Sequence, residues 1–257
     1  MNRIIFGGGF DPIHLGPINM AIMAQKAYPG EVITATSQTG NILLLGDIDA
    51  GQDVAAKTGG DGGILLNNPF AEIFDAETGN VRAGRNVSLE TENTGLLVAG
   101  KVVADTGSVT ATTQNSFIMF AGDVQAGRDI EANITKGDED SYIQYLGTTV
   151  AGNNVIAMTK QGNIQYEKNV TAGNIVQALT DKGDILYDAD VTAGNSVLGY
   201  TMDGKIAVGD EILAREGDVQ LTTANGSVIV GEADKTGKIT AGKNVSITTR
   251  KSACRSG

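Results

Sequence analysis

The sequence predicts an all-β protein: a right-handed parallel β-helix (β-solenoid) with coils of about 21 residues, preceded by a short N-terminal strand-turn-helix segment. Three observations predict this fold. Glycine accounts for 35 of the 257 residues, about twice the average usage. Two short phrases recur from Gly40 to the C-terminal region. Aromatic residues make up only 5% of the chain, so the core must consist of Val, Ile, Leu and Ala.

The N-terminal segment differs from the rest of the chain. Residues Arg3 to Phe6 form a short apolar run, which predicts a strand, and a glycine-rich turn follows. From Pro17 to Ala27 the apolar residues have helical spacing, and proline suits the first position of a helix. We therefore divide the chain into an N-terminal segment or cap (1–29), a repeat region (30–250) and a polar tail (251–257).

The repeat consists of two phrases that alternate. The first is Ala-Gly, one or two polar residues and a β-branched residue, as in AGNNV from Ala151. The second is Gly, a polar residue and Ile or Val, as in GNI from Gly162. Gly152, Gly173 and Gly194 lie 21 residues apart, and a second series with the same spacing begins at Gly162.

Each phrase predicts a turn followed by a short strand. Glycine permits a positive φ at the turn, and a neighbouring Asn or Asp tolerates the same region and hydrogen bonds to its own backbone. One strand pair cannot bury its apolar face, but stacked coils form a continuous core. If residues 29–257 form such coils, we expect about eleven of them in a rod about 50 Å long.

Irregular spacings predict insertions at Asn67 to Phe74 and at Lys136 to Tyr142. An antiparallel β-sandwich is the competing fold, but it would not explain the equal spacing.

Charge and rare residues exclude several functions. The net charge of −11 disfavours nucleic acid and anionic lipid as partners. We expect no membrane insertion, because no apolar stretch is long enough to span a bilayer. Cys254 is the only cysteine and His14 the only histidine, which excludes an internal disulfide and a cysteine-based zinc site. We expect no metal site. The first residues do not resemble a signal peptide, so the chain as written is expected in the cytoplasm.

Strings such as VRAGRNVSLET (from Val81) and ITAGKNVSITT (from Ile239) resemble the repeats of filamentous haemagglutinin-like and leukotoxin-type filamentous adhesins. The resemblance covers most of residues 30–249. It implies a right-handed parallel β-helix, an extracellular or cell-surface location of the parent adhesin, and attachment to a host-cell or bacterial surface receptor or glycan. We expect this chain to depart from the family in having neither the signal peptide nor the N-terminal secretion domain.

Residues 4–28 resemble the opening of nicotinate-nucleotide adenylyltransferases, which belong to the nucleotidyltransferase family. The matching residues include Gly7, Gly8, Phe10, Asp11, Pro12, His14 and Gly16. The resemblance implies ATP with Mg²⁺ as the cofactor, His14 as the catalytic residue, and Gly7, Gly8, Phe10, Asp11 and Gly16 around the nucleotide phosphates. A glycine turn lets the backbone approach a phosphate, and the N-terminus of the following helix favours its charge.

Three features depart from that enzyme pattern. Pro17 occupies the place of the second histidine and cannot donate a hydrogen bond. Gly9 replaces a hydroxyl residue, and repeats replace the rest of the α/β domain. SITTR (Ser246 to Arg250) resembles a late loop of the enzymes, but SLET follows AGRNV in the same way, so we interpret SITTR as part of the repeat.

Two other motifs allow a binding role. GGDGG (from Gly59) is similar to calcium-binding repeats but occurs once, so we expect a flexible corner. GDEDS (from Gly137) contains three carboxylates that could hold a hard cation, and a solvated loop is the alternative. The function we predict is structural and adhesive, without cofactor. The alternatives are a truncated, inactive nucleotidyltransferase and a carbohydrate-binding or carbohydrate-cleaving solenoid.

Overall fold

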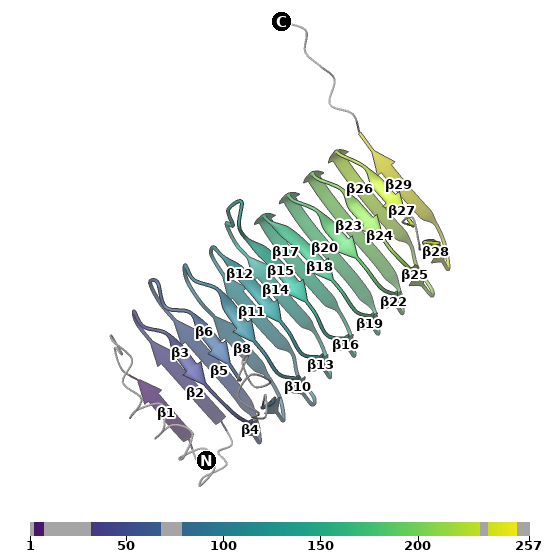
Figure 1. Cartoon of the computed structure of the whole chain (residues 1–257). Helices are drawn as coiled ribbons and strands as arrows, with labels where there is room; N and C mark the ends of the chain where they lie inside the picture. Colours follow the sequence, from purple (N-terminus) through teal and green to yellow (C-terminus); the bar gives the residue numbers. More distant parts are fainter. Residues whose placement is uncertain (1–2, 8–31, 68–78, 232–235, 251–257) are drawn as a thin grey trace, which may run out of the picture.

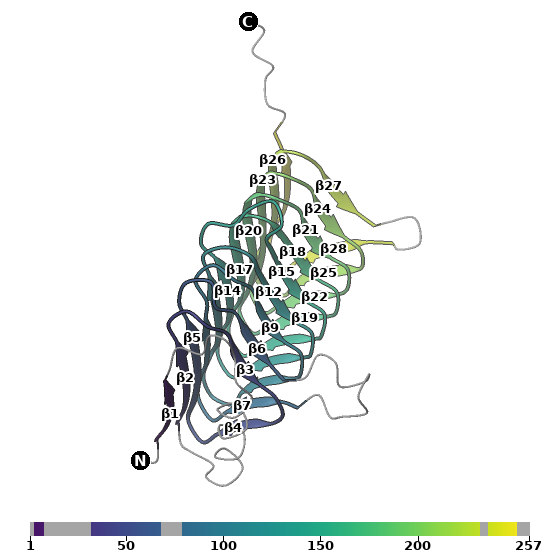
Figure 2. The same cartoon turned by 60° about the vertical axis from the view of Figure 1, so that its left-hand side comes forward.

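The computed structural model describes residues 3–7, 32–67, 79–231 and 236–250, and all the regular elements within them are β-strands. The strands stack side by side into a rod (Figure 1). Three sheets, A, B and C, run along it, and all pairings between neighbouring described strands are parallel. Figure 2 shows the coils one above another along the rod. The predicted all-β parallel solenoid is confirmed.

Sheet A has eleven strands. They are β1 (Arg3–Gly7), β2 (Val32–Ser37), β5 (Asp53–Thr58), β8 (Val87–Glu90), β11 (Val109–Thr113), β14 (Ile130–Ile134), β17 (Val155–Gln161), β20 (Ile175–Lys182), β23 (Ser196–Asp203), β26 (Val219–Asn225) and β29 (Val245–Thr249).

Sheets B and C have nine strands each. Sheet B contains β3 (Ile42–Leu44), β6 (Ile64–Leu66), β9 (Leu96–Val98), β12 (Phe117–Phe120), β15 (Tyr142–Tyr145), β18 (Asn163–Tyr166), β21 (Ile185–Tyr187), β24 (Ile206–Val208) and β27 (Val228–Val230). Sheet C contains β4 (Ile48–Ala50), β7 (Val81–Ala83), β10 (Val102–Ala104), β13 (Val124–Ala126), β16 (Thr149–Ala151), β19 (Val170–Ala172), β22 (Val191–Ala193), β25 (Glu211–Ala214) and β28 (Lys238–Ala241).

Each coil contributes one strand to A, then to B, then to C, so the described residues form nine complete coils. The predicted number of about eleven was wrong because some coils are longer than 21 residues. Asp53 and Asn86, one coil apart, are separated by 33 residues, whereas Asn163 and Asp184 are separated by 21. The eleven strands of sheet A nevertheless make a stack about 50 Å long.

The number of strands in a coil also differs from the prediction. Two strands per coil were expected, one after each phrase, so the stretch from Ile164 to Thr171 should be a single strand. The structure divides it into β18 and β19, with a corner at residues 167–169. This corner between sheets B and C was missed because it contains no glycine in that coil.

The corner glycines form columns, as predicted. Two different physical reasons require glycine at these corners. Gly162 and Gly183, between sheets A and B, have φ of 124° and 144°, which L-residues rarely adopt. The glycines of the Ala-Gly phrases are required for a different reason, because the backbones of neighbouring coils approach each other closely there. A Cβ on Gly173 would overlap with the carbonyl oxygen of Gly152 in the coil before, and one on Gly194 with that of Gly173.

In the most regular coils the second phrase marks one corner, since Gly162, Gly183 and Gly204 all lie between sheets A and B, but elsewhere in the chain it marks other corners. Gly162 lies between sheets A and B, Gly122 between B and C, and Gly107 between C and A. What the three phrases share is the Ile or Val two positions later. Ile164, Val124 and Val109 are each the first inward residue of the next strand and are buried.

We expected the polar residue of the phrase to hydrogen bond to its own backbone. It bonds to the next coil instead. The Asn163 side-chain oxygen accepts a hydrogen bond from the N–H of Asp184 at 2.8 Å, and Asp184 accepts one from the N–H of Lys205 at 2.9 Å. These bonds link successive coils at a surface corner.

The predicted insertions lie at corners. Residues 136–141 form the turn between β14 and β15. The insertion at Asn67 to Phe74 begins after β6, but residues 68–74 lie outside the described residues. GGDGG forms the corner between β5 and β6, where the Thr58 hydroxyl donates to the Gly62 carbonyl at 2.5 Å. Ser246 to Thr249 of SITTR belong to β29, which confirms that this string is part of the repeat.

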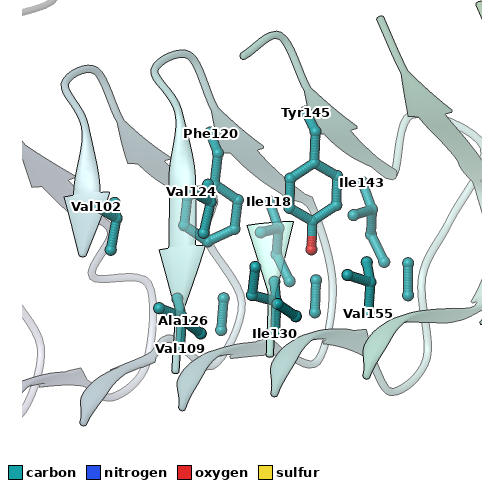
Figure 3. Packing of buried hydrophobic residues seen from close by; sticks show 14 of the residues in the cluster. Val102, Val109, Ile118, Phe120, Val124, Ala126, Ile130, Ile143, Tyr145 and Val155 are labelled. Carbon is teal, nitrogen blue, oxygen red and sulfur yellow. The ribbon is translucent and has the colours of Figure 1, made fainter. Parts of the chain in front are cut away.

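The core consists of stacked columns of inward side chains. Sheet C contributes a column of alanines, such as Ala151, Ala172 and Ala193, and sheet A a column of β-branched residues. Sheet B contributes four aromatic rings: Phe120, Tyr145, Tyr166 and Tyr187 stack at centroid distances of 5.3, 5.0 and 5.6 Å. Figure 3 shows Phe120 and Tyr145 pointing into the interior beside Ile118 and Ile143.

Three tyrosine hydroxyls lie in this core. Tyr145, Tyr166 and Tyr187 are at most 1% exposed, and no described protein group hydrogen bonds to their hydroxyls. Burial disfavours the charged phenolate and raises the pKa of each well above its ordinary value of 10.0.

The buried tyrosines make the fold sensitive to alkali. Above pH 10 the unfolded chain releases three protons that the folded chain retains, so stability is full below pH 10 and is lost as pH rises. Each tyrosine lowers the free energy of unfolding by about 1.4 kcal/mol for every pH unit above 10. The three together lower it by about 4 kcal/mol per pH unit. Circular dichroism against pH, read beside tyrosinate absorbance, should show these phenols ionising only on unfolding. The chain has six tyrosines, so the contradicting result is a tyrosinate signal near pH 10 that the folded chain gives and that disappears when Tyr145, Tyr166 and Tyr187 are replaced by Phe. Replacing all three by Phe should remove the sensitivity.

The N-terminal segment is described only at Arg3–Gly7, where β1 pairs with β2 in sheet A. The predicted strand is confirmed, while the helix expected at Pro17 to Ala27 lies outside the described residues. In the described part of the chain there is no helix with the length and apolarity needed to span a membrane.

Candidate binding surface on the outer face of sheet B

The outer face of sheet B carries two stacked aromatic rings. In β12 and β15 the side chains alternate, so that Ile118, Phe120, Ile143 and Tyr145 point inward while Phe117 and Tyr142 point outward. The rings of Phe117 and Tyr142 stack with centroids 5.2 Å apart and planes 8° from parallel. The far side of Phe117 lies over Gly95, where a Cβ would collide with the ring.

A hollow borders Tyr142 on the side away from Phe117. It is lined by the loop residues Glu139 to Ser141, by Tyr142 and Gln144, and by Asn163, Gln165 and Leu186 of the next two coils. Partial burial raises the pKa of Tyr142 above 10.0, so its hydroxyl is protonated at neutral pH. The hollow therefore combines an aromatic ring, amides and carboxylates.

The loop beside the hollow is held by Asp138. Its carboxylate accepts hydrogen bonds from the Ser141 hydroxyl at 2.7 Å and from the N–H of Asp140 at 3.1 Å. Glu139 and Asp140 are exposed. Among the described residues, no three His, Cys, Asp or Glu side chains gather as a metal site would require. GDEDS is therefore a hydrogen-bonded turn that carries three exposed acidic residues, of which Asp138 holds the turn.

The amides of the hollow are oriented by a network that crosses three coils. The Gln144 amide donates to Gln165 at 3.2 Å and to Glu167 at 3.0 Å. The Gln165 amide donates to Asp188 at 2.7 Å. Fixed amides and carboxylates beside an aromatic ring can recognise a polar ligand by hydrogen bonds while the ring covers an apolar face of it.

A second hollow lies on the other side of Phe117. It is lined by Leu43, Leu65 and Leu97, whose side chains point outward, and by Gly63 and Gly95, which have no side chain to fill it. The outer face of sheet B is thus apolar in β3, β6, β9 and β12, and polar side chains follow in β15 and β18.

The residues predicted for nucleotide binding are not brought together in the described part of the chain. Gly7 is the last residue of β1, paired with Thr36. Gly8, Phe10, Asp11, His14 and Gly16 lie outside the described residues. Sequence analysis missed Tyr142, Gln144 and Gln165. The strings FIMF, YIQY and NIQY, which occupy the same sheet position in three successive coils, are the signal that could have identified them.

Comparisons with protein-family models, curated proteins and solved structures found no match. The likeness to filamentous haemagglutinin-like repeats therefore rests on the recurring phrases and on the parallel solenoid, which is consistent with such repeats.

Proposed function

We propose that this chain is a structural and adhesive, non-catalytic repeat segment of a filamentous haemagglutinin-like surface adhesin. The observation that carries the proposal is the unbroken parallel stacking of nine coils. Such stacking gives a stiff rod, because every coil is hydrogen bonded to its neighbours along three sheets. A rod of this kind holds a surface at a distance from its attachment point.

The outer face of sheet B is the surface that we assign to adhesion. Its ligand would be a host-cell or bacterial surface receptor or glycan at the hollow beside Tyr142. The alternative, a nucleotidyltransferase using ATP with Mg²⁺ and His14, has less support because residues 32–67, 79–231 and 236–250 contain strands and no helix.

Tyr142→Ala is expected to weaken binding to a glycan array or to host cells about tenfold, because the stacking surface is lost. Tyr200→Ala is the matched control, since Tyr200 also points outward, from sheet A, and its loss should leave binding unchanged. Equal weakening by both variants would contradict the assignment of the surface.

The enzymatic alternative has its own test. Measurable nicotinate-nucleotide adenylylation by the purified chain, abolished by His14→Ala, would overturn the proposal. If the alternative is right, ATP should bind with millimolar or better affinity.

A further inference from the structure

The hollow beside Tyr142 has an aromatic wall with one open face. One side of the Tyr142 ring is covered by Phe117, with the ring centroids 5.2 Å apart, and the other side borders the hollow. The stacking holds the ring in place, so that it presents a flat face to a ligand in the hollow. Such a face attracts a cation, because the electron density of the π-system makes it negative.

The amides around the hollow offer a ligand more hydrogen-bond acceptors than donors. Both N–H groups of the Gln144 amide are used, on Gln165 at 3.2 Å and on Glu167 at 3.0 Å, which leaves its carbonyl oxygen for a ligand. One N–H of Gln165 is used on Asp188 at 2.7 Å. A carbonyl oxygen accepts hydrogen bonds and cannot donate them, so the hollow favours a ligand that donates.

The charges at the hollow have one sign. Glu139 and Asp140 line it and are exposed, and the described residues that line it include no lysine or arginine. The net charge of the chain, −11, also attracts a cationic partner from a distance. An anionic ligand, such as an acidic glycan, would be repelled by both. The ring face, the free acceptor and the charge therefore favour the same chemistry, a cation that donates hydrogen bonds.

The neighbouring apolar hollow indicates what kind of partner carries this cation. Leu43, Leu65 and Leu97 line it on the far side of Phe117. Aliphatic side chains suit such a surface, whereas a sugar would place hydroxyls there without hydrogen-bond partners. β9 and β15 are two strand spacings apart, about 10 Å, which an extended peptide spans with about three residues. One protein segment can therefore reach both hollows.

We propose that the hollow beside Tyr142 binds an arginine side chain of a protein partner, whose guanidinium stacks on the open face of Tyr142 and donates to Glu139 and Asp140. Arginine fits better than lysine because its planar guanidinium can stack on a ring and donate to carboxylates at the same time. An aliphatic side chain of the same segment occupies the apolar hollow. This inference rests on the proposed function and selects a protein receptor, rather than a glycan, as the ligand.

A titration of the isotope-labelled 257-residue chain with a short peptide, followed by nuclear magnetic resonance, tests the inference. The probe is acetyl-Leu-Gly-Gly-Arg-amide, in which leucine and arginine are three residues apart. We expect the side-chain amide signals of Gln144 and Gln165 to shift, with a dissociation constant on the order of 1 mM that rises with salt. Replacing arginine by citrulline, which has the same shape without the charge, should weaken binding at least about tenfold, because hydrogen bonds from a charged donor are stronger.

Two double variants separate the hollow from the charge of the whole chain. Glu139→Gln with Asp140→Asn should weaken peptide binding at least about tenfold and leaves Asp138 to hold the turn. Glu131→Gln with Asp181→Asn is the matched control, because it removes the same two charges from exposed positions of β14 and β20 in sheet A. Its binding should be unchanged. All four residues are exposed, and the spectrum of each variant shows directly whether the coils remain folded.

The inference is overturned if the peptide shifts neither amide signal, if the citrulline peptide binds equally well, or if both double variants weaken binding equally. These results are separable from a failure of the proposed function. If Tyr142→Ala weakens attachment to cells or glycans while the peptide does not bind, the surface is adhesive but its ligand is not a basic protein segment. If Tyr142→Ala leaves attachment unchanged, the assignment of the adhesive surface fails, whether or not the peptide binds.

Discussion

Replacing Tyr166 by alanine is expected to lower the free energy of unfolding by about 4 kcal/mol, the range for deleting a large buried aromatic side chain. Tyr166 is fully buried and stacks between Tyr145 and Tyr187, at 5.0 and 5.6 Å. Its removal leaves a cavity that strands held in register on both sides cannot close. Chemical denaturation followed by circular dichroism measures the loss.

Tyr166→Phe separates packing from the hydroxyl. Because no described protein group bonds to that hydroxyl, we expect the phenylalanine variant to be as stable as the wild type or up to about 1 kcal/mol more stable. A loss of several kcal/mol in this variant would show that the hydroxyl is hydrogen bonded and that the packing account is wrong.

Gly173→Ala is expected to cost about 3 kcal/mol or more, because a single added methyl group overlaps with a backbone oxygen. The atom it meets is the Gly152 carbonyl oxygen, which belongs to the column of Ala-Gly corners. Neither backbone can move away without breaking the hydrogen bonds between coils, such as that from the Gly173 N–H to the Ala151 carbonyl at 3.0 Å.

Gly46→Ala is the matched control, with the same chemical change at another corner. No atom lies within 4 Å of a Cβ placed on Gly46, although its φ is 91°. Only the strain of a positive φ remains, about 1 kcal/mol. If the two variants lose equal stability in denaturation experiments, close stacking of the corners is not the reason for the Ala-Gly phrase.

The sequence was sufficient to predict the parallel stack, because Gly152, Gly173 and Gly194 each sit against the same backbone position of the preceding coil. It was insufficient for the third strand. The corner at Glu167 to Asn169 needs neither a positive φ nor a close approach, so no glycine marks it.

The candidate surface was harder to predict than the core. Phe117 and Phe120 lie in the same strand, and only the inward or outward direction of each side chain decides whether it belongs to the surface or to the interior. That direction follows from the register between coils, which Ile118 and Ile143 fix. The hollow also needs residues 139–141, whose position depends on a turn held by Asp138.

Distances between spin labels test the central claim, the regular stacking of coils, most directly. Asp49, Val150 and Thr240 point outward from sheet C, in β4, β16 and β28. Val150 lies four strands from Asp49 and Thr240 eight strands, which corresponds to about 19 and about 38 Å at the usual strand spacing. Pulsed electron resonance on labelled chains diluted with unlabelled chain should give distances in this ratio of one to two. Distances that do not grow in proportion to the number of strands would contradict the solenoid.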